Sequence, residues 1–374
     1  MNISVGIVGL PNVGKSTLFN ALAQKSVPAE NYPFCTIDPS VGVVPVPDER
    51  LEKLVSLSKS EKVIPAVIEF VDIAGLVQGA SRGEGLGNNF LSNIREVDTI
   101  LHLVRVFDIK DDTATEQVHV YGDIDPIRDI EVIMMELILA DMQTLQNRRA
   151  KLFRDVRLGN KDAIAIDLIC EKLHQTLDTS KTARTLELSD TDAALASGLH
   201  LLTMKPIIFG FNIKSGGKNL SADEVSFQKI KKHIQEKYVS DFVILDAHSE
   251  SDLTSSFSDL SERESIRSSL LADSADTGIP TLIRKCYELL GLITFFTTGP
   301  DETRAWTINR GDTAPVAGAA IHNDFQNKFI RAQVVSYDDL VTDGNFTAAR
   351  SAGHLRTEGK EYVVRDGDVV EFLI

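Results

Sequence analysis

The chain has 374 residues and carries a formal net charge of −15 at pH 7. Hydrophobic residues make up 43% of it and charged residues 25%, which is typical of a globular protein with room for two or three domains. No apolar run approaches the roughly 18–20 residues that cross a bilayer, and the acidic balance argues against wholesale attraction to nucleic acid or anionic lipid. The three cysteines lie far apart without a C-x-x-C pair, which indicates a reducing, cytoplasmic environment rather than a zinc or disulfide framework.

The first motif along the chain is G-x-x-x-x-G-K-S at residues 9–16, between an apolar strand-like run at residues 3–8 and a helical pattern at residues 16–24. This context predicts a phosphate-binding loop. Its backbone N–H groups turn toward the phosphates, the lysine reaches the β and γ oxygens, and the serine hydroxyl binds Mg²⁺. The residues expected to hold the nucleotide here are Asn12, Val13, Gly14, Lys15, Ser16 and Thr17.

Two further segments are expected to complete the magnesium and γ-phosphate site. The proline-containing loop at residues 27–40 offers the Thr36 hydroxyl as a second metal ligand, with an ordinary loop threonine as the competing interpretation. A strand predicted at residues 66–71 ends in D-x-x-G. In that motif Asp72 holds a metal-bound water and the Gly75 N–H meets the γ-phosphate.

The residue after this D-x-x-G is Leu76, where many GTPases carry the glutamine that orients the attacking water. An aliphatic side chain cannot hydrogen-bond to water, so another group must position the water or hydrolysis is slow. His119 is the candidate, because it follows a buried strand predicted at residues 99–106, where catalytic groups of open α/β sheets gather. His102, inside that strand, is expected to be structural.

Residues 127–151 and 161–177 keep helical period and predict two long antiparallel helices joined by residues 155–160. Around this joint the sign of the chain's charge reverses, because six basic side chains stand among only two acidic ones. The basic residues are Arg148, Arg149, Lys151, Arg154, Arg157 and Lys161. Two interpretations stay open: a solvated helix face, and an arm that binds RNA or another partner.

The chain returns to the sheet in a buried strand at residues 206–211, followed by Asn212-Ile213-Lys214-Ser215 where a guanine-specific enzyme has N-K-x-D. Guanine offers two neighbouring donors that a carboxylate accepts together, which Ser215 cannot do. Adenine offers a donor and an acceptor that the Asn212 amide complements, and Ile213 replaces the lysine whose stem covers the base. This pattern favours ATP. The segment Asp246-Ala247-His248-Ser249-Glu250, which follows a strand predicted at residues 242–245, is expected to border the base from the other side.

After an amphipathic helix predicted at residues 279–290, the chain changes to short alternating strands, predicted at residues 293–297, 303–308, 330–335 and 369–374. They indicate a small β-rich unit. From residue 291 onward there are twelve acidic and eight basic side chains, so a protein-interaction or regulatory module is favoured over specific RNA contact.

Together these motifs resemble the YchF, or Obg-like ATPase, family of P-loop proteins, and the resemblance spans the whole chain. The segments that carry it are the phosphate loop, Tyr32-Pro33-Phe34-Cys35-Thr36-Ile37, Asp72-Ile73-Ala74-Gly75-Leu76, Gly83-Glu84-Gly85-Leu86-Gly87-Asn88, Asp129-Ile130-Glu131-Val132-Ile133 and Ile321-His322-Asn323-Asp324-Phe325. The resemblance implies an α/β fold in three parts. These are a Ras-like P-loop G domain (residues 1–125 and 204–290), an inserted α-helical coiled-coil hairpin (126–203) and a carboxyl-terminal β-grasp, or TGS, domain (291–374).

The resemblance also implies an activity. Members of the family hydrolyse ATP in preference to GTP through an N-x-x-E motif, which this chain matches at Asn212 but not at Ser215. They carry a hydrophobic residue after D-x-x-G, matching Leu76, and a water-activating histidine on a loop, which corresponds to His119 by motif context. They associate with ribosomes and take part in stress responses.

We therefore expect a cytoplasmic, Mg²⁺-dependent ATPase switch. Ser16, Thr36 and Asp72 bind the metal, Lys15 and His119 act in catalysis, and Asn212 and Ile213 hold adenine. The expected partners are ATP, the ribosome through its large subunit, RNA on the basic arm and proteins on the TGS domain, with K⁺ as a further candidate cofactor. The alternatives are a GTPase of the same fold and a nucleotide-gated ribosome- or protein-binding module whose hydrolysis is incidental.

Overall fold

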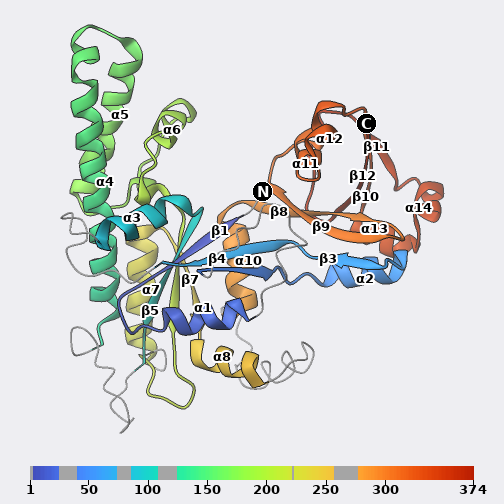
Figure 1. Ribbon diagram of the computed structural model, residues 1–374, viewed down its shortest axis with the longest axis horizontal. Helices are drawn as coiled ribbons and strands as arrows, with labels where there is room; N and C mark the ends of the chain where they lie inside the picture. The colour runs from blue at the N-terminus through green and yellow to red at the C-terminus, as the bar shows by residue number, and fades with distance from the viewer. Residues whose placement is uncertain (1–2, 25–39, 74–85, 108–123, 221–222, 257–276) are drawn as a thin grey trace.

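The computed structural model of the protein describes residues 3–24, 40–73, 86–107, 124–220, 223–256 and 277–374. In this part of the chain, two six-stranded sheets and a pair of long helices form three neighbouring bodies (Figure 1). Three of the expected site residues, Thr36, Gly75 and His119, lie outside the described ranges, and so does Leu76.

The first sheet has the strand order β2-β4-β1-β5-β6-β7, with β2 antiparallel to β4 and the other neighbours parallel. Its strands are β1 Ser4–Val8, β2 Val41–Pro45, β4 Val67–Asp72, β5 Thr99–Arg105, β6 Ile207–Asn212 and β7 Asp241–Leu245. Every residue of β5 and β6 is buried, as expected for central strands with both faces covered. The strands predicted for this region are confirmed within one or two residues at each end.

Helices cover this sheet and share one hydrophobic core with it. They are α1 Lys15–Ala23, α3 Leu86–Glu96, α7 Glu224–Tyr238, α8 Ala247–Ser256 and α10 Ile279–Leu289. Because β1, β4, β6 and β7 run in the same direction, their carboxyl ends lie at one edge of the sheet. The phosphate loop, the D-x-x-G motif, Asn212 and Asp246 each lie at or directly after one of these four ends.

Two long helices, α4 Pro126–Arg157 and α5 Lys161–Asp178, form an antiparallel hairpin that projects from the sheet (Figure 1). The Asp125 side chain caps the amino end of α4, and Asn160 caps α5 by accepting from two backbone N–H groups. The predicted joint is too long, because α4 continues to Arg157 and residues 158–160 alone turn the chain. Despite its 32 residues, α4 is too charged to cross a membrane, and none of the other described helices is long and apolar enough to do so.

The hairpin is rooted in the nucleotide-binding body rather than attached to it by a linker. Ile130, Ile133 and Leu137 in the first half of α4 lie in the core of the first sheet. Farther out, Leu145 of α4 packs with Leu173 of α5 in a separate core. That core also includes residues around the short elements η3 Ala183–Thr185 and α6 Asp190–Ser197, and η4 Leu202–Met204 leads back to the sheet.

The second sheet has the order β11-β10-β12-β8-β9-β3. Its carboxyl-terminal strands are β8 Leu292–Thr298, β9 Glu302–Asn309, β10 Arg331–Ser336, β11 Arg356–Glu358 and β12 Asp368–Leu373. Short helices connect them: α11 Ala314–Ala319, α12 Asn323–Asn327, α13 Tyr337–Asp343 and α14 Phe346–Ala352. The four strands predicted here are confirmed, whereas the three-residue β11 was not predicted.

The sixth strand of this sheet comes from the amino-terminal half of the chain. β3 Lys62–Ile64 pairs in parallel with β9, and the preceding helix α2 Glu49–Ser58 lies beside the same sheet (Figure 1). Leu51 and Leu54 of α2 are buried in a cluster with Phe296, Val335 and Leu340. By packing, α2 and β3 therefore belong with the carboxyl-terminal body, although the expected boundary at residue 291 leaves them out.

Arg50 of α2 fastens the two halves of the chain to each other. Its guanidinium bonds to Asp48 through Nε at 2.9 Å and Nη2 at 2.7 Å, and to Asp366 through Nη1 at 2.7 Å. It also lies 5.0 Å from the centre of the Phe296 ring. The two carboxylates raise the pKa of this guanidinium against the opposing effect of burial, so the cation is favoured in the folded protein.

Replacing Arg50 by Ala is expected to lower the free energy of unfolding by about 1–2 kcal/mol, because half-buried charge-assisted bonds and ring packing are lost together. Urea unfolding measures this change. Lys53→Ala is the matched control, since Lys53 is exposed on the same helix. Equal stability of the two variants would show that Arg50 does not fasten the amino-terminal half to the second sheet.

Candidate nucleotide-binding site

The loop between β1 and α1 has a backbone conformation that requires glycine. Gly14 has φ of 100°, and a Cβ there would lie 2.3 Å from Nδ2 of Asn212, so a larger residue is excluded both by conformation and by contact. Its carbonyl accepts the Leu18 N–H at 2.9 Å and starts the helix. The first turn of α1 has no acidic side chain, which leaves its backbone N–H groups and positive dipole end suited to an anion.

Lys15 lies across this loop. Its side chain is 8% exposed, and Nζ donates to the carbonyl oxygens of Gly9 at 3.0 Å and Leu10 at 2.8 Å. Burial lowers the pKa of the amine, and the Asp72 carboxylate partly opposes that effect. The ammonium group is thus held over the loop by backbone oxygens. A phosphate would add negative charge beside this buried cation, in addition to the Asp72 carboxylate.

Ser16 and Asp72 supply oxygen ligands near this cation. Ser16 is exposed in the first turn of α1, and Asp72 ends β4, in register with Ile7 of β1. Burial raises the pKa of the Asp72 carboxyl, and Lys15 opposes the shift. A hydroxyl and a partly desolvated carboxylate fit Mg²⁺, which prefers oxygen and keeps waters and phosphate oxygens as its other ligands. The described residues contain no cluster of three His, Cys, Asp or Glu side chains that could hold a metal by themselves.

Asn212, at the end of β6, joins three parts of the site. Nδ2 donates to the Val13 carbonyl of the phosphate loop at 2.8 Å, and Oδ1 accepts the Ala247 N–H at the start of α8 at 3.0 Å. The residue is only 3% exposed. Both ends of the amide are therefore engaged by backbone groups of the protein. The structure gives Asn212 a connecting role, and direct recognition of adenine by its side chain stays a prediction.

The loop after Asn212 is fixed mainly by hydrogen bonds within the protein. Ile213 donates its N–H to the Leu245 carbonyl at 2.7 Å, and its half-buried side chain packs against the core of the first sheet. The Asn219 side chain accepts from the Lys214 N–H and donates to the carbonyl oxygens of Lys214 and Gly217. Asn219 was not predicted as a site residue, although an asparagine in a glycine-containing loop is a typical signal for such backbone contacts.

Asp246 is the buried first residue of the segment 246–250 that is predicted to border the base. It is 1% exposed, and its carboxylate caps α8 by accepting the Ser249 N–H at 2.9 Å. It also accepts the backbone N–H and the hydroxyl of Ser215, at 2.8 and 2.6 Å. Asp246 therefore lies behind Ser215. This pairing was not predicted, because it joins loops that follow two different strands.

His102 is structural, as predicted. It is 1% exposed on β5 and lies beside Phe209, with ring centres 5.3 Å apart. Burial, together with the nearby Lys15 charge, lowers its pKa to about 3, so the imidazole is neutral at physiological pH.

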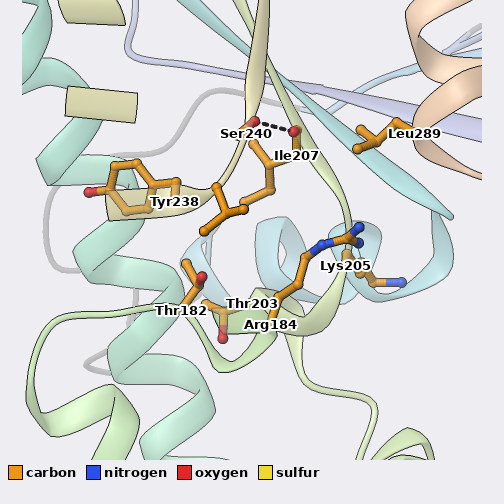
Figure 2. Close-up of a pocket in the computed structure, with 9 residues that line it drawn as sticks. Thr182, Arg184, Thr203, Lys205, Ile207, Tyr238, Ser240 and Leu289 are labelled. Atoms are coloured by element: carbon orange, nitrogen blue, oxygen red, sulfur yellow. Dashed lines mark hydrogen bonds between the residues drawn. The ribbon is translucent and has the colours of Figure 1, made fainter. Parts of the chain in front are cut away.

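A small enclosed cavity lies at the opposite edge of the sheet, near the amino ends of β6 and β7. Figure 2 shows Thr182, Arg184 and Thr203 on one side of it, with Ile207 and Ser240 on the other, where the Ser240 hydroxyl donates to the Ile207 carbonyl. Its volume is about 10 Å³, the space of about one water molecule. It is too small for a nucleotide and lies at the edge of the sheet away from the phosphate loop.

A phosphate loop after β1, an aspartate at the end of the neighbouring β4 and an asparagine at the end of β6 define a P-loop nucleoside-triphosphate-binding protein. Residues 4–136 match the family model described as 50S ribosome-binding GTPase. Residues 292–374 match the model of the YchF GTPase carboxyl-terminal family, described as a protein of unknown function. The chain belongs to the YchF family.

Individual relatives agree over the whole length. The chain is 45% identical to the ribosome-binding ATPase YchF of Bacillus subtilis and 44% identical to that of Escherichia coli O157:H7, covering 100% of this chain and 99% of each relative. Among solved structures, the Schizosaccharomyces pombe YchF GTPase is 37% identical with a TM-score of 0.85, covering 100% of this chain and 98% of that one. The predicted family and its α/β P-loop fold are confirmed.

Replacing Asn212 by Ala is expected to weaken binding of both ATP and GTP, because the Val13 carbonyl and the Ala247 N–H lose a buried partner. One such loss costs about 1–3 kcal/mol, so we expect roughly a tenfold loss of affinity or more. Titration with non-hydrolysable analogues of both nucleotides measures it.

The control is Asn20→Ala, an exposed position on α1. Unchanged affinity in the Asn212 variant would contradict the connecting role. A loss confined to ATP would instead support direct contact between Asn212 and adenine.

Proposed function

We propose that the chain is a Mg²⁺-dependent ATPase that acts as a ribosome-associated switch in the cytoplasm. One observation carries the choice: full-length relatives at 41–45% identity are named ribosome-binding ATPases. The buried Lys15 and the oxygen ligands Ser16 and Asp72 support the phosphate-transfer part of this proposal. The three-part division into a P-loop domain, a helical insertion and a TGS domain is part of it, with α2 and β3 assigned to the last.

In the proposed mechanism the loop residues 12–17 and the Gly75 N–H hold the phosphates, and Lys15 exchanges its backbone contacts for phosphate oxygens. Ser16, Thr36 and Asp72 would hold Mg²⁺, which would supply positive charge next to the phosphate oxygens. His119 positions the attacking water, because a leucine follows the D-x-x-G motif. Ile213 covers the base, with Asn212 beside it.

A GTPase of the same fold is the alternative. It gains support because the Schizosaccharomyces pombe relative is described as a GTPase, whereas the bacterial relatives are described as ATPases. Against it stands Ser215, which lacks the carboxylate that accepts both guanine donors together.

The deciding measurement is binding and hydrolysis of ATP and GTP by the purified full-length chain, with and without ribosomes. We expect at least tenfold tighter binding of ATP, slow turnover, loss of turnover when EDTA removes Mg²⁺, and stimulation by ribosomes. Replacing NaCl by KCl in the same assay tests K⁺ as a cofactor. Tighter binding and faster hydrolysis of GTP would reject the proposal in favour of the alternative.

Two variants in the same assay separate the roles of individual residues. Lys15→Ala is expected to reduce hydrolysis by roughly 100-fold, as for loss of one preorganised charge contact to the reacting group. Lys53→Ala is the control, because Lys53 is an exposed residue of α2. His119→Ala tests water positioning: a hydrolysis rate equal to that of the unchanged protein would remove His119 from the mechanism.

We assign RNA contact on the ribosome to the tip of the hairpin. Arg148, Lys151, Arg154, Arg157 and Lys161 are exposed there, whereas Arg149 is paired with Asp167 of the facing helix at 2.8 Å. Phe153 is 58% exposed, with the Arg157 guanidinium 4.4 Å from its ring centre. Exposed arginines beside an aromatic ring suit phosphates and unstacked bases, which supports this arm over a merely solvated face.

Replacing Arg148, Arg154 and Arg157 together by Gln is expected to weaken ribosome binding by tenfold or more and to flatten its salt dependence, with basal hydrolysis unchanged. Co-sedimentation with ribosomes at several KCl concentrations measures both effects. The matched control replaces three exposed lysines outside the hairpin, Lys53, Lys229 and Lys360, by Gln. Equal losses in the two triple variants would show general charge attraction rather than a specific arm.

The same experiment addresses the third hypothesis, a nucleotide-gated binding module with incidental hydrolysis. Ribosome binding that responds to ATP analogues but persists fully in Lys15→Ala would favour that hypothesis. The TGS unit is left to protein partners in the proposal, because its acidic residues outnumber its basic ones.

A further inference from the structure

Ser215 and Asp246 form a hydrogen-bonded pair at the place where base specificity is decided in P-loop GTPases. The Ser215 hydroxyl donates to Oδ2 of Asp246 at 2.6 Å, and the Ser215 N–H donates to the same oxygen at 2.8 Å. Ser215 is exposed, whereas Asp246 is buried beneath it. The carboxylate therefore holds the serine from inside the protein.

Asp246 is held by four hydrogen bonds from neighbouring groups of the protein. Besides the two Ser215 donors, it accepts the Ser249 N–H on Oδ1 at 2.9 Å and the Ser249 hydroxyl on Oδ2 at 2.9 Å. Three of these four donors therefore lie on Oδ2 and one lies on Oδ1. Asp246 is only 1% exposed, so its burial closes it to a ligand, whereas Ser215 above it is exposed.

Hydrogen bonds connect the Ser215–Asp246 pair to the phosphate loop. Ser215 follows Asn212 by three residues, and Asp246 directly precedes Ala247. The Asn212 amide joins Ala247 to Val13 of the phosphate loop, so the Ser215 loop, the start of α8 and the phosphate loop are one connected unit. Contacts of Asn219 with the backbone of Lys214 keep the serine loop in shape.

A serine hydroxyl is ordinarily both a donor and an acceptor, and the bond to Asp246 removes the donor. Ser215 then presents only oxygen lone pairs to whatever lies on its exposed side. It is one acceptor, which matches a single amino group such as N6 of adenine. Guanine would meet it with two adjacent donors and leave one of them without a partner at Ser215.

We infer that Ser215, oriented by Asp246, is a specificity-determining residue that selects adenine over guanine through a single hydroxyl acceptor. This inference rests on the proposed ATPase function. It attributes the preference for ATP to a serine hydroxyl rather than to a carboxylate that contacts the base. Ser215 is the contacting residue, and Asp246 is a positioning residue that acts through it.

The test measures the affinities of non-hydrolysable ATP and GTP analogues for the full-length chain and three variants. Ser215→Ala removes the acceptor and is expected to weaken ATP binding about fivefold, the size expected for one neutral hydrogen bond, with a smaller loss for GTP, so that the ATP-to-GTP affinity ratio falls. Ser215→Thr keeps the hydroxyl and is expected to retain the ATP preference. Ser226→Ala is the control, because Ser226 donates to Asp223 at the same 2.6 Å in a remote helix cap.

A double exchange, Ser215→Asp with Asp246→Ser, moves the carboxylate to the exposed side. It is expected to shift the ATP-to-GTP affinity ratio toward GTP by tenfold or more, because a carboxylate accepts both guanine donors. Unchanged ATP affinity in Ser215→Ala, with a clear ATP preference in the unchanged protein, overturns this inference and leaves the ATPase proposal intact. If the unchanged protein binds GTP as tightly as ATP, the proposed preference fails. In that case a fivefold loss for ATP in Ser215→Ala still upholds the serine contact, and no loss overturns it.

Discussion

The amide of Asn212 is the contact on which the geometry of the nucleotide site depends. One end holds the Val13 carbonyl of the phosphate loop and the other holds the first N–H of α8. Three segments that are far apart in the sequence thereby acquire fixed positions relative to one another. The glycine at residue 14 follows from the same contact, because the amide nitrogen occupies the space that a side chain there would need. The position of Lys15 depends on the same contact, because its two carbonyl partners belong to the phosphate loop.

Local patterns predicted much of the structure. The strands of the first sheet, the two long helices and the four longer carboxyl-terminal strands follow from periodicity, caps and turn residues that lie close together in sequence. The phosphate loop was predictable because its glycines, lysine and serine occupy one short stretch. The family resemblance then supplied the order in which these parts assemble, and the comparisons agree with it over the full length.

Contacts between distant segments could not be predicted in the same way. β3 has three residues, too few to show an alternating pattern, and its partner β9 lies about 240 residues farther along the chain. The bonds from Ser215 to Asp246 likewise join two loops, and the sequence offers a serine and an aspartate without showing that one covers the other. The opposite case is Arg149, whose basic character suggested a binding role, while its partners Asp167 and Glu171 lie on the facing helix.

The short connection between β3 and β4 links the two sheets. β3 ends at Ile64 in one sheet and β4 begins at Val67 in the other, so two residues separate strands that belong to different bodies. β4 runs from there to Asp72, the carboxylate at the metal edge. The carboxyl-terminal body is therefore connected to the first sheet between β3 and β4 as well as near residue 291. Through β3 and β4 it is joined by a short, continuous run of backbone to Asp72, a residue predicted to bind the metal.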